Sequence, residues 1–183
     1  MEISNRFLAL LRGINVGGNN IIKMADLKAC FEKRSFSDVT TYIQSGNVIF
    51  SSDEIDTVKL EAQIENILSE TFNYQSRVVV VSHQQLKAMI EKAPAGFGLF
   101  PETHKYDVVF LKRPLTAENA LPDIVARKEV DYVYAMNGVL YFSRLISNLS
   151  KSYLSKIITL PIYKHMTIRN WNTTSKLLEL MKK

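Results

Sequence analysis

LALLRGINVGGNNIIK (Leu8–Lys23) predicts a buried strand, then a long loop rich in glycine and asparagine, then a helix that begins directly after the loop. Three of the chain's seven glycines lie in this loop, at Gly13, Gly17 and Gly18. Glycine and asparagine tolerate positive φ, so successive backbone N–H groups in such a loop can point inward together and hold an anion. The loop is therefore the first place to look for a ligand site, although it identifies no reaction.

The composition is that of an ordinary soluble protein, and 183 residues suffice for one good core or two small ones packed together. We expect no signal peptide, and the sequence contains no apolar run long enough to cross a membrane. The single cysteine, Cys30, excludes a disulfide within the chain and suits a reducing compartment. It shares a helical pattern with Met24, Leu27 and Phe31, which favours a core thiol over a nucleophile. We expect a cytoplasmic protein.

The positive charge is concentrated in the last quarter of the chain. From Arg144 to Lys183 there are eight Lys and Arg residues against one acid, Glu179, a net charge of +7. The whole chain carries +5, so residues 1–143 carry −2. A basic quarter suits an anionic partner, either nucleic acid or a phosphorylated small molecule, but a solvated cationic surface explains it at least as well.

The order of predicted elements in the first half is βαββαβ followed by one more helix. Strands are expected at 6–12, 39–44, 48–51 and 77–81, and helices at 24–34, 56–72 and from 82 or 83 onward. The turn Ser45-Gly46-Asn47 joins the second and third strands. Residues 93–104 (APAGFGLFPETH) contain two prolines and two glycines and predict a connection between the two halves.

The same order of elements follows that connection. Strands are expected at 106–112, 129–135, 139–143 and 165–169, and helices at 116–125, 149–160 and 173–182. Thr116 is a candidate N-cap, and Pro122 predicts that its helix is short or broken. Asn137-Gly138 is the strongest hairpin signal in the chain. The halves share no convincing sequence identity, so any repeat lies in the order of elements alone.

This order predicts an α+β fold of two ferredoxin-like βαββαβ subdomains with antiparallel sheets, each with two helices on one face. The first subdomain is expected to span residues 1–92. Residues 93–104 connect it to the second subdomain, which spans residues 105–183 and includes a basic C-terminal helix. The first two strands of each unit are expected to run parallel, so their C-terminal ends lie at one end of the sheet. In the first half that end carries both Gly/Asn-rich turns, about 10 Å apart, or two strand spacings.

We therefore expect a shallow anion site between these two turns. Its candidate residues are Arg12, Gly13, Asn15, Gly17, Gly18, Asn19, Lys23, Gln44, Ser45 and Asn47. As surface loop residues, Arg12 and Asn15 are predicted to tolerate alanine with little loss of stability. A structural turn remains the competing interpretation of the loop.

Three segments, ALLRGINVGGNN with KMADL, TYIQSGNVIFSS and TIRNWNTTSKLLEL, resemble the hallmark segments of an uncharacterised bacterial family, domain of unknown function sixteen ninety-seven. The resemblance runs from about Phe7 to Leu180. It implies an α+β fold of two ferredoxin-like subdomains and no established activity. The positions that match the family are Arg12, Gly13, Asn15, Gly17, Gly18, Gln44, Ser45, Gly46, Asn47, Arg169, Asn170 and Trp171.

Known catalytic motifs do not match the opening loop. Gly13 and Gly18 have the G-x-x-x-x-G spacing of a P-loop, but Asn19-Asn20 stand where Lys-Ser/Thr should be, and Lys23 is too far along to substitute. The glycine spacing of a dinucleotide fingerprint is absent as well. The three histidines are isolated, so no zinc site is expected, and we expect no cofactor. The acids at positions 53, 54 and 56 suit a helix start better than catalysis.

A second candidate anion site lies near the C-terminus and comprises Lys151, Arg169, Asn170 and Trp171. In the structural interpretation, Asn170 caps the last helix and Trp171 packs on the core. In the functional one, Arg169 contacts an anion and Trp171 offers a stacking surface.

Two classes of function stay open. We favour a site for a small phosphate- or carboxylate-bearing ligand at the Gly/Asn loop, and the alternative is a nucleic-acid-binding module that uses the basic C-terminal region. The second lacks the aromatic signature of RNA-recognition domains. Nothing assigns a catalytic residue or an oligomeric state, and whether the protein is an enzyme stays open too.

Overall fold

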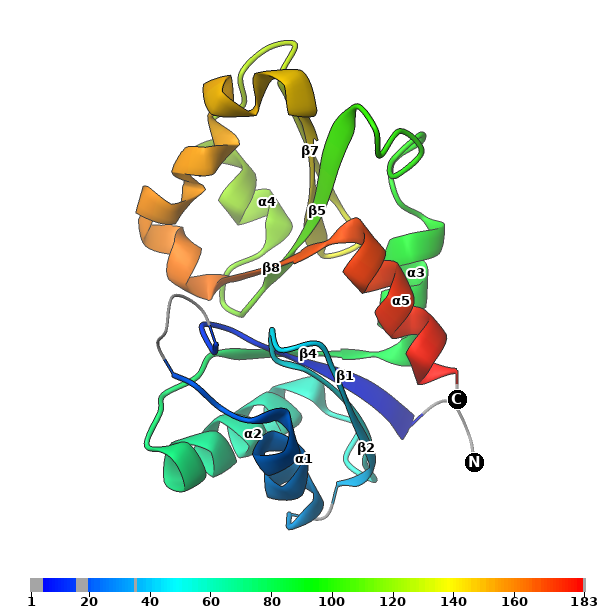
Figure 1. Ribbon diagram of the computed structural model, residues 1–183, viewed down its shortest axis with the longest axis vertical. Helices are drawn as coiled ribbons and strands as arrows, with labels where there is room; N and C mark the ends of the chain where they lie inside the picture. The colour runs from blue at the N-terminus through cyan, green and yellow to red at the C-terminus, as the bar shows by residue number, and fades with distance from the viewer. Residues whose placement is uncertain (1–4, 16–19, 35, 183) are drawn as a thin grey trace. The chain divides into compact units, whose positions relative to one another are not determined.

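The computed structural model describes residues 5–15, 20–34 and 36–182. The chain divides into two compact units, Met1–Lys87 with Lys176–Lys183, and Ala88–Ser175. The division falls inside two helices, α3 (His83–Glu91) and α5 (Trp171–Met181), which therefore contribute to both units (Figure 1). The predicted connection at 93–104 lies within the second unit.

The first unit has the predicted ferredoxin-like arrangement. Its sheet runs in the order β2 (Ser37–Tyr42), β3 (Asn47–Ser51), β1 (Arg6–Leu11) and β4 (Val78–Ser82), and every neighbouring pair is antiparallel. Helices α1 (Met24–Glu32) and α2 (Thr57–Phe72) cover one face (Figure 1). Because β1 and β2 are both antiparallel to β3, they run parallel to each other, and their C-terminal ends lie at the same end of the sheet.

The core of this unit lies between the two helices and the sheet. Leu27 and Phe31 of α1 meet Phe50 of β3, and the rings of Phe31 and Phe50 are 5.7 Å apart between centroids. The strand β1 is buried on both faces from Phe7 to Leu11, as its continuous apolar run predicts. Cys30 is buried too, which confirms the predicted core thiol.

The second unit repeats the strand order of the first. Its sheet runs β6 (Asp131–Met136), β7 (Val139–Leu145), β5 (His104–Leu111) and β8 (Met166–Asn170), again antiparallel throughout. The hairpin at Asn137-Gly138 is confirmed, with φ of 53° and 77° at the two residues. The helix predicted from Thr116 is short: α4 spans Ala117–Ala120, a 3₁₀ turn follows at Leu121–Asp123, and the Thr116 hydroxyl accepts a hydrogen bond from the Asn119 N–H.

The α-helix predicted at 149–160 is wrong. Three 3₁₀ turns stand there instead, at Ile146–Lys151, Leu154–Thr159 and Pro161–His165, here called the 3₁₀ segment. Ser152 and Leu160 adopt extended ψ values of 132° and 139° between the turns. Pro161 forces the preceding Leu160 out of the helical region, and the many Ser, Thr and β-branched residues give the stretch little helix propensity. Burial of Leu154 and Ile157 then determines its path.

Candidate functional site

The end of β1 is joined directly to the turn after β2. The Leu11 N–H donates to the Gly46 carbonyl at 2.8 Å, while the next N–H, of Arg12, donates to the Arg77 carbonyl at 3.0 Å. A Cβ at Gly46, where φ is 75°, would lie 2.8 Å from the Leu11 Cβ. Only glycine therefore allows this turn to approach β1 so closely.

Asn15 joins the opening loop to that turn. Its side-chain Nδ2 donates to the carbonyls of Ile22 and Gln44, both at 3.0 Å, and its Oδ1 accepts from the Ile22 N–H at 2.8 Å. Asn15 is half-buried and has a positive φ of 53°. The expectation that Asn15→Ala leaves stability nearly unchanged assumed a surface loop residue. The structure does not support that assumption, because the half-buried amide holds together segments that lie 29 residues apart.

The start of α1 lies beside this junction. Ile22, held by Asn15, is two residues from the first residue of the helix, and the N-cap residue Lys23 forms no capping hydrogen bond through its side chain. Lys23 is exposed and follows the loop directly. A helix N-terminus without a side-chain cap offers backbone donors and a partial positive charge to an anion. Asp26 in the first turn works against this attraction.

The other predicted site residues divide into exposed and structural ones. Gly13 and Gln44 are exposed, whereas Arg12 and Ser45 are half-buried. Asn47 is fully buried, and its Nδ2 donates to the Tyr42 carbonyl at 3.0 Å and the Ser45 hydroxyl at 2.9 Å, so its amide stabilises the turn. Gly17, Gly18 and Asn19 lie outside the described residues.

Tyr74 closes the base of the loop. Its hydroxyl donates to the carbonyl of Arg12, and burial raises the pKa of the phenol above its ordinary value. At neutral pH the hydroxyl therefore keeps its proton and acts as a donor. This contact anchors the residue that follows β1.

The C-terminal candidate residues have structural partners. Asn170 is the N-cap of α5, because its Oδ1 accepts from the Thr173 N–H at 2.7 Å, and Trp171 packs edge-on against Phe97 at 5.1 Å. Arg169 donates to the Ile168 carbonyl, and burial lowers its pKa to about 10, so it stays charged at neutral pH. Lys151 follows the end of β7, whereas Arg169 lies on β8, with β5 between those strands.

The central strands of the second sheet carry aromatic residues that the chain itself covers. Tyr106 lies on β5 and Tyr141 on β7, the two central strands of this sheet, and RNA-recognition domains stack bases on aromatic residues of a four-stranded sheet. The ring of Phe97 packs on both, at 4.8 and 5.2 Å between centroids, and both tyrosines are buried. The exposed tyrosines of this sheet, Tyr132 and Tyr134, lie on the edge strand β6.

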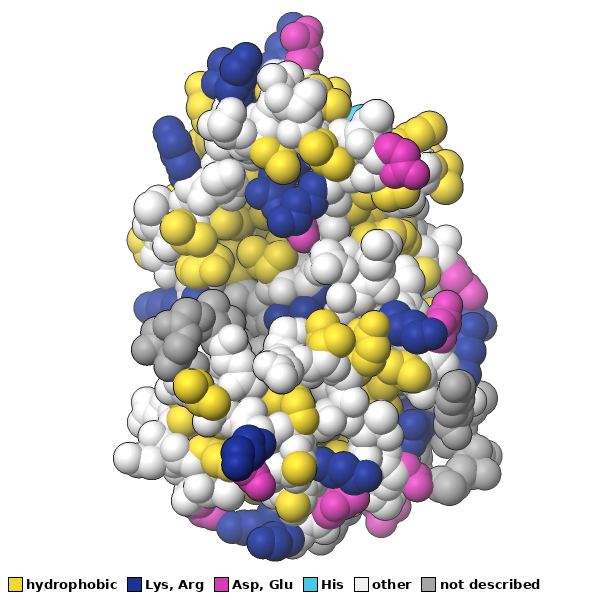
Figure 2. Space-filling view, in the orientation of Figure 1, with side chains coloured by type: hydrophobic (Ala, Val, Ile, Leu, Met, Phe, Trp, Pro, Cys, Tyr) yellow, Lys and Arg dark blue, Asp and Glu magenta, His cyan; other side chains and the backbone are white. Residues whose placement is uncertain are grey.

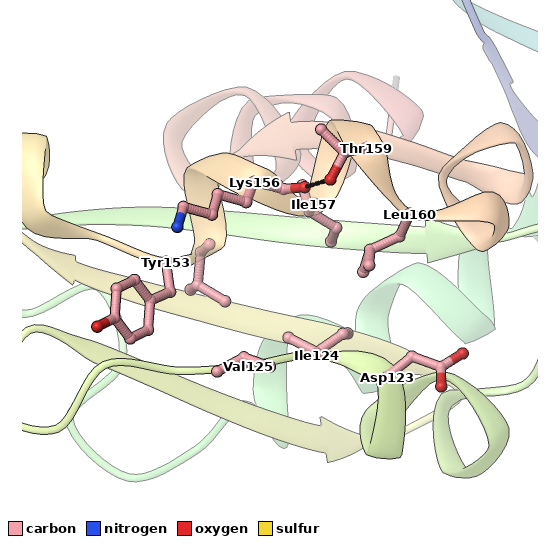
Figure 3. Close-up of a pocket in the computed structure, with 9 residues that line it drawn as sticks. Asp123, Ile124, Val125, Tyr153, Lys156, Ile157, Thr159 and Leu160 are labelled. Carbon is pink, nitrogen blue, oxygen red and sulfur yellow. Dashed lines mark hydrogen bonds between the residues drawn. The ribbon is translucent and has the colours of Figure 1, made fainter.

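Sequence reasoning did not foresee a cavity in the second unit. Its volume is about 300 Å³, and it lies between the 3₁₀ segment and the residues after α4 (Figure 3). The proline and clustered serines of 147–161 were the signal that the predicted helix would fail and leave space.

Among the described residues, no group of three or more His, Cys, Asp or Glu is placed to hold a metal ion. None of the described helices is long and apolar enough to span a bilayer.

The architecture defines the class of protein: an α+β chain with two ferredoxin-like antiparallel sheets, each having the same strand order, and a C-terminal helix. The chain belongs to the family described as Protein of unknown function (DUF1697), whose family model matches residues 4–141.

A solved structure, that of the conserved bacterial protein SP0830 from Streptococcus pneumoniae, is similar, with a TM-score of 0.85 over 96% of this chain and 98% of that one. The two share 24% sequence identity, so the likeness shows the fold alone. No curated protein matches the chain.

Proposed function

We propose that the protein binds a small phosphate- or carboxylate-bearing molecule where the opening loop meets the turn after β2. The observation that carries the proposal is the double attachment by Asn15, which ties the start of α1 to the turn at Gln44. Backbone donors from a helix start, an exposed lysine and an exposed amide side chain are thereby brought to one end of the first sheet.

The contribution of each group follows from its chemistry. The N–H groups of the first turn of α1 would donate to an anionic oxygen, as helix N-termini do for phosphates. Lys23 would add a point charge without demanding a fixed geometry, and the Gln44 side chain would select a ligand with a hydrogen-bonding group beside the anion. No residue is assigned a catalytic role, and the proposal is binding in a cytoplasmic setting.

The test is a thermal-shift titration with inorganic phosphate and a panel of phosphorylated metabolites, with chloride matched in ionic strength. A ligand at ten times its dissociation constant stabilises the folded state by about 1.4 kcal/mol, which raises the melting temperature by roughly 3–6 °C. We expect Lys23→Met to weaken the response. Lys33→Met is the matched control, because Lys33 is also exposed but lies at the opposite end of α1.

Equal thermal-shift responses in Lys23→Met and Lys33→Met would contradict the placement of the ligand at the start of α1.

Nucleic acid is the competing partner, supported by the basic last quarter of the chain. A gel shift by short oligonucleotides that weakens steeply with salt, and is reduced by Lys151→Met but not by Lys23→Met, would favour it instead.

A further inference from the structure

We propose that the cavity in the second unit binds an amphipathic small anion, with an apolar chain in the cavity and a carboxylate or phosphate head at Lys156. This site lies on other residues, in the other unit, and stands independently of the proposed function.

The walls of the cavity are apolar and come from two stretches of chain. One is the 3₁₀ segment, which contributes Leu154, Ile157 and Leu160. The other follows α4 and contributes Ile124 and Val125. Leu154 and Ile157 are buried and belong to the core cluster of this unit, so the cavity is lined in part by core side chains. Figure 2 shows hydrophobic side chains gathered around the 3₁₀ segment of this unit.

Part of the rim of the cavity is apolar as well. Val125, which lines it, is 66% exposed, and Ile124 and Leu160 are half-buried. An apolar side chain in water costs about 25 cal/mol for each Å² left exposed, so a ligand that covers Val125 gains by burying it. A volume of about 300 Å³ is at the small end of ligand pockets, which limits the occupant to a small molecule.

The charges at the rim orient the ligand. At one end the Tyr153 ring lies below two cations, with Lys156 Nζ 5.2 Å and Arg127 Cζ 5.4 Å from its centroid. At the other end lies the carboxylate of Asp123 (Figure 3). Within the described parts of the chain, Lys156 is paired with no carboxylate. The anionic head of the ligand therefore belongs at the Tyr153 end, and the apolar chain of the ligand extends toward Leu160.

The probe for this site is octanoate, with about ten non-hydrogen atoms. At roughly 0.4 kcal/mol per atom, within the range of ligand efficiencies, such a ligand binds with a dissociation constant near 1 mM. Acetate carries the same head without the chain, and octan-1-ol carries the chain without the charge. Titrations followed by ¹H–¹⁵N NMR on the full chain should show millimolar octanoate shifting the amides of residues 124–125 and 153–160. We expect octan-1-ol to bind several-fold more weakly and acetate to produce no saturable shift there.

Three variants locate the two halves of the ligand. Lys156→Met keeps the aliphatic stem and should weaken octanoate binding three- to tenfold while leaving octan-1-ol binding unchanged. Lys164→Met is the matched control, an exposed lysine of the same segment outside the cavity, and should change neither. Val125→Asp changes an exposed side chain at the rim and should weaken both ligands.

The proposal is overturned if octanoate at 10 mM leaves the amides of the cavity unshifted. It is equally overturned if Lys156→Met and Lys164→Met bind octanoate alike, or if acetate and octanoate bind alike. Because none of these variants replaces a core residue, each protein should fold, and its NMR spectrum without ligand verifies that it has.

Discussion

At the scale of single residues, Asn15 shows how a polar side chain can hold a loop together. Its amide uses both donor and acceptor atoms, and its partners are backbone groups of Ile22 and Gln44. Its positive φ is one that asparagine tolerates better than most residues. These two properties together explain why an asparagine stands at this position.

Asn15→Ala is expected to destabilise the fold by about 1–3 kcal/mol, because it leaves the N–H of the buried Ile22 and the carbonyls of Ile22 and Gln44 without that partner. Urea denaturation measures the loss. Gln44→Ala is the control, since Asn15 binds the backbone carbonyl of Gln44, and this variant should change stability by less than about 0.5 kcal/mol. A similarly small loss of stability in Asn15→Ala would show that the hydrogen bonds of Asn15 do not stabilise the fold.

At the scale of elements, the segment between α3 and β5 covers the second sheet on the face opposite the 3₁₀ segment. Phe97 lies at its centre and contacts Tyr106, Tyr141 and Trp171. The Tyr141 hydroxyl donates to the carbonyl of Met89 at 2.7 Å, which fastens the end of α3 to the same face. A stretch that looks like a flexible connection in sequence is thus part of a core.

Two glycines of this segment provide a matched test. Gly96 and Gly98 both have positive φ, of 79° and 83°, so an added Cβ strains the backbone of each by roughly 1–2 kcal/mol. At Gly98 the Cβ would also lie 2.2 Å from Trp171 Nε1, whereas at Gly96 it would meet nothing within 4 Å.

Gly98→Ala should therefore lower stability more than Gly96→Ala does, by a further 1–3 kcal/mol or so. It should also change the fluorescence of Trp171, the single tryptophan. Denaturation curves and emission spectra of the two variants provide the comparison, and identical behaviour would mean that Trp171 does not pack against the segment as described.

At the scale of the whole molecule, we expect stability to depend on pH through a buried histidine, His83. Burial lowers the pKa of His83 below its ordinary value, and the positive charges of Lys87 and Lys182 lower it further. The His83 Nε2 is buried with no hydrogen-bond partner among the described residues. His83 in the folded state therefore takes up a proton only at a lower pH than His83 in the unfolded state, which is protonated below about pH 6.5.

The contribution of His83 to the free energy of unfolding is therefore fully present above about pH 6.5. It is lost as the pH falls toward the lowered pKa of His83 in the folded state. His83→Gln should show a smaller loss of stability between pH 7.5 and pH 5.0 than the wild-type protein does. Lys87→Met keeps the histidine but removes one of the repelling charges, so its loss should be intermediate. Urea midpoints at both pH values test this, and equal losses in all three proteins would mean that His83 does not contribute.

The sequence by itself determined most of the local structure and the order of the strands. Apolar runs and helical periods located β1, α1 and α2, and turn chemistry located the hairpin at Asn137-Gly138, because these signals involve residues close in the chain. The βαββαβ order then led to the ferredoxin-like topology and to the meeting of two turns at one end of the first sheet. Anion binding there stays a prediction.

Tertiary structure alone decided what depends on contacts between distant residues. Asn15 reaches Gln44 across 29 positions, and no local pattern reveals that its amide is used in this way. At 149–160 the sequence signals conflict, because apolar residues recur at helical spacing whereas Pro161 and the serines oppose a helix. The burial of Leu154 and Ile157 decided in favour of 3₁₀ turns, which leave a cavity beside them. Packing outweighs weak local propensity, since burying two large apolar side chains stabilises the fold by more than a few residues of helix would.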